Sequence, residues 1–181
     1  MKTTKTFTVK NLVLGAMFLA IALVMPFLTG QIPQFGQALC PMHFPVILAG
    51  YVCGGPVALI VGFVAPILRF FIFSMPPIFP TGIAMAFELA AYGLFSGLFY
   101  RIFKKSIFGT YASLLLAMVI GRAVWGIVTF FITMANAGAE PFTFSAFIAG
   151  SVLGSVPGII AQIVLIPLIV LTLKKAKLIK E

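Results

Sequence analysis

The sequence contains no aspartate, and it has three acidic residues, one histidine and one tryptophan in all. The absence of aspartate excludes most phosphoryl-transfer and aspartyl-protease chemistry. The chain also lacks a P-loop, a GxGxxG motif followed by an acid, and an HExxH motif. A Ser-His-Asp triad needs a base beside its serine, and the single histidine, His43, begins an apolar run. We therefore expect no enzyme and no bound cofactor.

Charge is scarce: 8% of the residues are charged, against roughly a quarter in soluble domains. With 62% hydrophobic residues, the chain has too much apolar surface for a soluble globular protein or a disordered one. The composition predicts a single integral membrane domain over residues 1–181, surrounded by lipid. The net charge of +9 does not indicate a nucleic-acid partner, because the basic residues stand at the ends of apolar runs.

Long apolar runs predict an all-α membrane protein with six transmembrane helices. Helices are expected because every backbone polar group must be satisfied internally in lipid. About 20 helical residues cross the hydrocarbon core, so five runs are long enough and the second is short. The predicted spans are approximately Asn11–Thr29, Met42–Cys53, Gly55–Phe73, Thr81–Tyr100, Tyr111–Met134 and Phe144–Leu173.

The distribution of basic residues predicts the orientation. All but two of the 12 lysines and arginines fall in three clusters, before the first span, between the fourth and fifth, and after the sixth. The loops on the opposite side contain no lysine or arginine. By the positive-inside rule, six spans place both termini in the cytoplasm.

Three charged residues remain inside the predicted spans: Arg69, Glu88 and Arg122. A charge at mid-bilayer costs about 2.5–3.5 kcal/mol on insertion scales, so each needs a partner or a wet cavity. Two interpretations stay open, and both can hold. Glu88 forms a structural ion pair with one arginine, or the residues line an outward-opening cavity where an arginine binds a substrate anion. Two arginines against one glutamate slightly favour an anion.

Neighbours at helical spacing extend this candidate site. Trp125, three positions after Arg122, could stack on a flat ligand, and Tyr92 follows Glu88 by one helical turn. Polar residues of the outer loops could act as a lid. No metal site is expected, because Pro41 separates Cys40 from Met42 and His43 and no second histidine exists. The predicted substrate-binding residues are Arg69, Glu88, Arg122, Trp125, Tyr92, His43, Gln37 and Asn136.

The arrangement resembles a known family, the substrate-binding S components of energy-coupling factor (ECF) vitamin transporters. The chain is similar to these proteins in its length of 181 residues and in its six short predicted helices. The stretch Pro45, Leu48-Ala49-Gly50, Gly55-Pro56 and Gly62 resembles the family pattern P-x-x-L-A-G-x(4)-G-P-x(5)-G. Ala16 and Ala20 resemble the AxxxA face with which the family contacts its coupling subunit.

This resemblance implies a high-affinity, outward-facing receptor in the bacterial plasma membrane. Such a receptor joins a coupling subunit (T component) and two ATPase subunits, which supply the energy. The implied substrate is a vitamin or vitamin precursor, either carboxylate-bearing like pantothenate or a heterocycle stacking on Trp125. The acidic residue that many members carry before the second-helix proline is absent from Leu39–His43, so no particular vitamin's binding residues are carried over.

Two other functions fit the sequence. A self-sufficient secondary carrier of a small organic anion would couple transport to protons through Glu88, as a homodimer. A membrane assembly factor without transport activity would need only the small-residue faces, such as that of Ala16 and Ala20.

Overall fold

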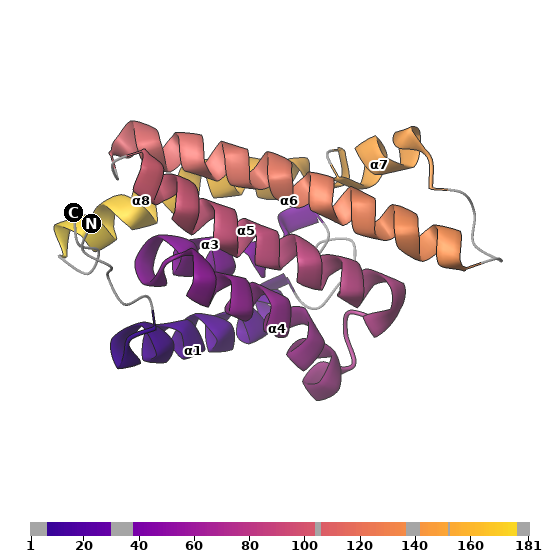
Figure 1. Ribbon diagram of the computed structural model, residues 1–181, viewed down its shortest axis with the longest axis horizontal. Coiled ribbons are helices and arrows are strands. Elements are labelled where there is room, and N and C mark those ends of the chain that lie inside the picture. Colours follow the sequence, from indigo (N-terminus) through magenta and orange to yellow (C-terminus); the bar gives the residue numbers. More distant parts are fainter. Residues whose placement is uncertain (1–6, 30–37, 104–105, 137–141, 152, 177–181) are drawn as a thin grey trace.

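The computed structural model describes residues 7–29, 38–103, 106–136, 142–151 and 153–176. Over these residues the chain is helical and contains no strand, which confirms the predicted all-α class. The helices form one elongated bundle (Figure 1). They are α1 (Val9–Val24), η1 (Met25–Thr29), α3 (His43–Cys53), α4 (Gly55–Phe73), η2 (Ile78–Gly82), α5 (Ile83–Ile102), α6 (Ile107–Ala135), α7 (Phe144–Ser151), η3 (Leu153–Ser155) and α8 (Val156–Lys175).

In the described part of the chain, five helical segments are long and apolar enough to cross a membrane, which identifies a multi-pass membrane protein. The remaining apolar helix, α3, has 11 residues and is about 16 Å long, well short of the hydrocarbon core. The predicted number of six spans therefore rests on α3 and stays a prediction. The five segments are Val9–Leu28, Gly55–Phe73, Ile78–Ile102, Ile107–Ala135 and Phe144–Lys175.

Helix α3 lies inside the bundle, against α1, α4, α5 and α8. Every residue of α3 except Val52 is buried, which suits a helix without a polar face. Its contact with α5 depends on glycine: a methyl group at Gly97 would lie 2.6 Å from the carbonyl oxygen of Gly50. The backbones therefore approach more closely than any side chain would permit. This approach holds α3 and α5 at a fixed distance and rotation.

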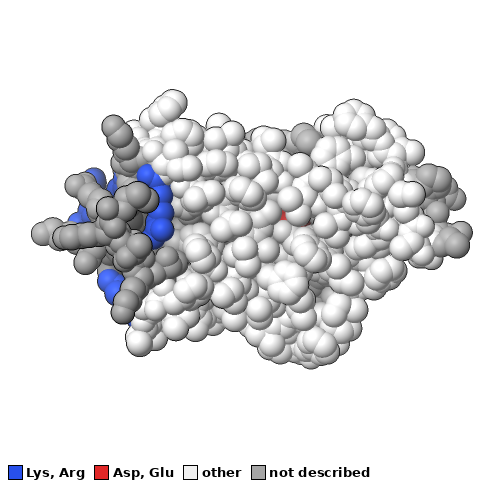
Figure 2. Space-filling view, viewed as in Figure 1, with Lys and Arg blue, Asp and Glu red and all other residues white. Residues whose placement is uncertain are grey.

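Among the described residues, the charged side chains that lie outside the bundle interior gather at one end. Lys10, Arg101, Lys174 and Lys175 lie at the start of α1 and at the ends of α5 and α8. Figure 2 shows the visible lysine and arginine side chains at a single end of the molecule. We call this the basic end and the opposite one the far end. Depth along each helix can therefore be counted from a common reference.

The last predicted span, Phe144–Leu173, is not one continuous helix. It divides into α7, η3 and α8, and the irregular turn at Leu153–Ser155 separates the two α-helices. Gly154 is a poor helix former, and Pro157 has no N–H to donate to the preceding turn. Pro157 is instead accommodated in the first turn of α8.

Candidate functional site

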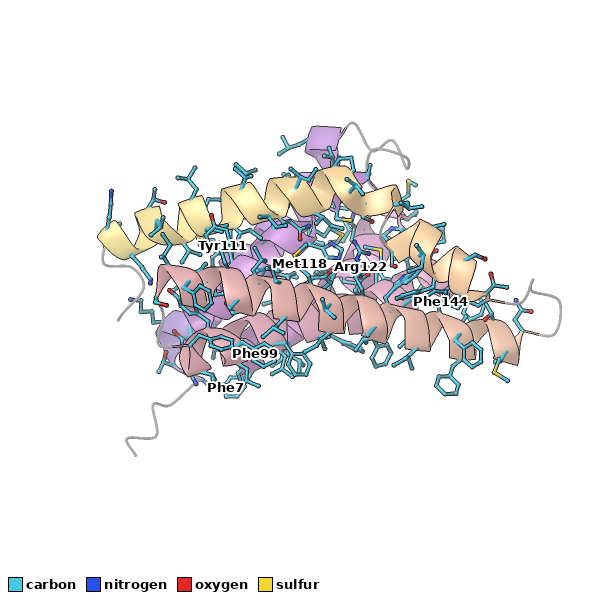
Figure 3. The ribbon with its side chains drawn as sticks, turned by 90° about the horizontal axis from the view of Figure 1, so that it is seen from above. Phe7, Phe99, Tyr111, Met118, Arg122 and Phe144 are labelled. Carbon is cyan, nitrogen blue, oxygen red and sulfur yellow. The ribbon has the colours of Figure 1, made fainter. Side chains whose placement is uncertain are left out.

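A buried ion pair stands at the centre of the bundle. Arg122 of α6 donates from Nη1 to Oε1 of Glu88 on α5, at 2.9 Å. Glu88 is only 2% exposed, and Arg122 lies between α6 and α8 in Figure 3. Glu88 is 14 residues from Ile102, so it lies about 21 Å from the end of α5 at the basic end. Of the two pairings that the sequence left open, the structure forms Glu88–Arg122.

His43 joins this pair from the first turn of α3. Its Nε2 lies 3.5 Å from Oε1 of Glu88, in ion-pair range but outside hydrogen-bond geometry. Neither ring nitrogen of His43 has a hydrogen-bond partner among the described residues. The ring packs edge-to-face on Tyr92, with centroids 4.9 Å apart. Tyr92 itself lies against Gly121, where an added methyl group would be 2.5 Å from the tyrosine ring.

Cys40 closes the cluster from the turn before α3. Arg122 donates from Nη2 to its Sγ at 3.5 Å, and the Ser155 side chain also hydrogen-bonds the thiol. Burial raises the pKa of the Cys40 thiol, which keeps it neutral. Glu88 is thus the group that balances the Arg122 charge. Glu88, Arg122, His43, Tyr92 and Cys40 are called the Glu88 cluster below.

Arg69 lies outside the Glu88 cluster. Its Nη1 donates to the carbonyl oxygen of Leu23, and its guanidinium carbon lies 5.4 Å and 5.2 Å from the rings of Phe27 and Phe73. No ion pair joins Arg69 to an acid in the described part of the chain. The excess positive charge of the spans therefore resides at a separate place, where it ties α1 to α4.

Trp125 lies one turn from Arg122 toward the far end and packs on α7. Its ring centroid is 5.8 Å from that of Phe142 and 6.2 Å from that of Phe147. A methyl group at Gly150 would lie 3.1 Å from the indole. Trp125, which is half-buried, therefore packs against the short helix α7 on the far-end side of Arg122.

The two predicted lid residues are not part of this arrangement. Asn136 is exposed at the C-terminal cap of α6, 14 residues or about 21 Å along the axis from Arg122. Gln37 lies outside the described residues. Of the predicted set, the structure brings Glu88, Arg122, His43 and Tyr92 together, with Trp125 adjacent.

Sequence reasoning missed a polar stripe on the last segment. Ser151, Ser155, Gly158 and Gln162 are all buried and recur at helical spacing across α7, η3 and α8. Gly158 packs on the chain before α3, since a methyl group there would lie 2.7 Å from the carbonyl oxygen of Leu39. A glutamine inside an apolar run is an available signal, because an unpaired buried amide costs free energy.

Ala16 and Ala20 are both exposed on α1, as a docking face requires. On the same helix Gly15 and Ala22 are buried and face the bundle. A shallow apolar groove between α1 and α4 includes Ala16. The alanine pair is therefore not used for packing within the chain.

Comparison with known proteins places these observations in a family. The model of the family "ECF transporter, substrate-specific component" matches residues 10–170. A comparison with curated proteins gave no significant match. A comparison with solved structures gave none either.

Proposed function

The chain belongs to the substrate-specific components of ECF transporters and is therefore a substrate-binding membrane subunit of such an importer. We propose that it takes up a vitamin or vitamin precursor and binds it at the Glu88 cluster. The family consists of transporter components and not of enzymes. The observation that supports this site is the buried Glu88–Arg122 pair with His43 beside it. Ionisable groups held within a membrane protein are by default functional.

The proposed topology follows from the basic end. We infer a single membrane domain over residues 1–181 with six membrane segments, counting α3, and both termini in the cytoplasm of a bacterial cell. The four basic residues at one end, Lys10, Arg101, Lys174 and Lys175, support this orientation through the positive-inside rule. The Glu88 cluster then lies in the outer half of the membrane, where a receptor meets its substrate.

The proposed partners are a T component and two ATPase subunits. The exposed alanine pair of α1, Ala16 and Ala20, supports a docking site for the T component. Small residues allow the backbone of a partner helix to approach closely in lipid. The ATPases supply the free energy of transport, and this chain supplies recognition.

The test is native mass spectrometry of the purified chain in detergent, followed by a thermal-shift titration with a vitamin panel. We expect a co-purified molecule of vitamin size in the wild type. Arg122→Gln should lose it, because the guanidinium that holds the cluster together is removed, and thermal unfolding of the same variant shows whether it still folds.

The same purified chain separates the rival functions. Proteoliposomes that contain only this chain should bind the substrate and not accumulate it. Accumulation driven by a proton gradient, and lost in Glu88→Gln, would instead establish a secondary carrier. A chain that is empty and unaffected by every vitamin would support an assembly factor.

A further inference from the structure

Two stacked layers cross the bundle near its centre. The first, the apolar layer, consists of four residues of one continuous hydrophobic cluster: Ile47, Tyr92, Met118 and Ile166. Each has a polar residue four positions away on its own helix. These four form the polar layer: His43, Glu88, Arg122 and Gln162.

In every case the polar residue is on the far-end side. Helices α3, α5 and α8 run toward the basic end, so the polar residue precedes its apolar partner in sequence. Helix α6 runs away from the basic end, so Arg122 follows Met118. Four residues span about 6 Å of helix, and the two layers are therefore about one turn apart.

A contact between the C-terminal parts of α8 and α5 supports placing Gln162 near the level of Glu88. Nζ of Lys174 lies 5.4 Å from the ring centroid of Tyr100, which aligns the ends of α8 and α5. Gln162 precedes Lys174 by 12 residues, and Glu88 precedes Tyr100 by 12 residues. Both therefore lie about 18 Å from this contact along parallel helices. Gln162 is also only 1% exposed, on the buried stripe that contains Ser155.

Several atoms of the polar layer lack partners. Within the described residues, Oε1 of Gln162, Nε of Arg122 and both ring nitrogens of His43 make no hydrogen bond. Ser151 Oγ, on the same buried stripe as Gln162, also has none. Buried polar atoms in native proteins are nearly always paired, by protein, water or ligand. The unmatched set includes an acceptor on Gln162 and a donor on Arg122.

The layer is also electrically balanced. Arg122 is matched by Glu88 at 2.9 Å, and Arg69, the other cation of the spans, is held by Leu23, Phe27 and Phe73. With Glu88 ionised and His43 neutral, a bound anion would leave one uncompensated negative charge within the membrane. Burying such a charge costs several kcal/mol.

We propose that Gln162 is a substrate-binding residue opposite the Glu88–Arg122 pair, and that the ligand is a small molecule without net charge that offers both hydrogen-bond donors and acceptors. This inference rests on the proposed function and narrows it. Gln162 accepts from the ligand, and Nε of Arg122 donates to it. The ion pair itself stays intact when the ligand binds.

The test uses pairs of molecules in which an amide or an alcohol replaces a carboxylate and so removes one negative charge: nicotinamide and nicotinate, panthenol and pantothenate, biotinamide and biotin. Each is titrated against the purified chain in detergent, with isothermal titration calorimetry and thermal shift as readouts. We expect that, in the pair that binds, the uncharged member binds at least about tenfold more tightly, because a missing buried charge partner is strongly unfavourable.

Two variants test the residues. Gln162→Met keeps the side-chain volume and should lower the affinity for the uncharged ligand about tenfold. Nε of Arg122 remains as a donor in this variant, but the acceptor of Gln162 is lost. Ile166→Val, one turn below on the same stripe, is the matched control and should bind like the wild type. Gln162→Asn serves as the second variant if the methionine variant does not fold. Glu88→Gln frees the Arg122 charge and should shift the preference toward the acid.

The outcomes are distinguishable. Tighter binding of the acid by the wild type would overturn the uncharged ligand and leave the proposed function in place. Wild-type affinity in folded Gln162→Met would overturn the assignment of Gln162. Binding of no member of any pair would overturn this inference, whereas the proposed function is overturned only if the purified chain is also empty by native mass spectrometry and unaffected by the whole vitamin panel.

Discussion

At the scale of single residues, the three charges of the spans have different surroundings. Glu88 and Arg122 satisfy each other, whereas Arg69 is satisfied by a backbone carbonyl and two aromatic rings. Cation–π contacts are worth about 2 kcal/mol or more when they are desolvated. Arg69 therefore stabilises the junction of α1 and α4, and Arg122 organises the polar layer.

This difference predicts that substitution of Arg69 lowers stability, whereas substitution of Arg122 lowers ligand affinity. Arg69→Gln should lower the free energy of unfolding by about 1–3 kcal/mol, because the Leu23 carbonyl loses a charged donor. It should leave ligand affinity unchanged in the fraction that folds. Arg122→Gln should abolish ligand binding. Thermal unfolding and calorimetric titration of both variants measure this, and equal loss of affinity in the two would show that Arg69 also faces the ligand.

At the scale of elements, α1 has two faces of different use. Ala22 is fully buried against the bundle, and Ala16 and Ala20 are exposed. Small apolar residues occur on both faces, so the hydropathy of the alanines does not distinguish them. Only the packing of α1 on α3 and α4 shows which alanines remain available to a partner.

The two faces predict a separation of stability from assembly. Ala16→Leu should leave the thermal unfolding and ligand affinity of the isolated chain unchanged, and should reduce co-purification with the T component. Ala22→Leu should overpack the bundle and destabilise it by about 1–3 kcal/mol. Normal assembly of Ala16→Leu and Ala20→Leu, each at wild-type abundance, would contradict the proposed docking face.

At the scale of the whole molecule, the charge distribution implies a direction in the membrane. The basic end carries Lys10, Arg101, Lys174 and Lys175, and no described residue at the far end is basic and exposed. The Glu88 cluster is displaced from the basic end by about 21 Å, more than half of the hydrocarbon thickness. Under the proposed topology, a substrate would reach this proposed site by the shorter path, from the far end.

Cysteine labelling of intact cells tests this orientation. Asn136→Cys, at the far end, should react with a membrane-impermeant maleimide without lysis. Lys175→Cys, at the basic end, should react only after the membrane is opened. The native Cys40 and Cys53 are both buried, so the unmodified chain should label weakly and serves as the control. The reverse pattern would invert the proposed topology.

Composition and local patterns are enough to predict the membrane class, the helical structure and the family resemblance. These properties are sums over local residues: hydropathy selects helices in lipid, and the P-x-x-L-A-G pattern is read directly from the chain. The sequence also located every intramembrane charge, since each interrupts an apolar run. Tyr92 was found through its one-turn spacing from Glu88.

The tertiary structure decided which of these charges meet. Helix rotation and crossing, fixed by close contacts such as Gly50 on Gly97, select Arg122 and not Arg69 as the partner of Glu88. Gln162 enters the polar layer because α8 packs beside α3 and α6. Local properties of the sequence do not predict these helix rotations, because the rotations result from contacts between residues far apart in the chain.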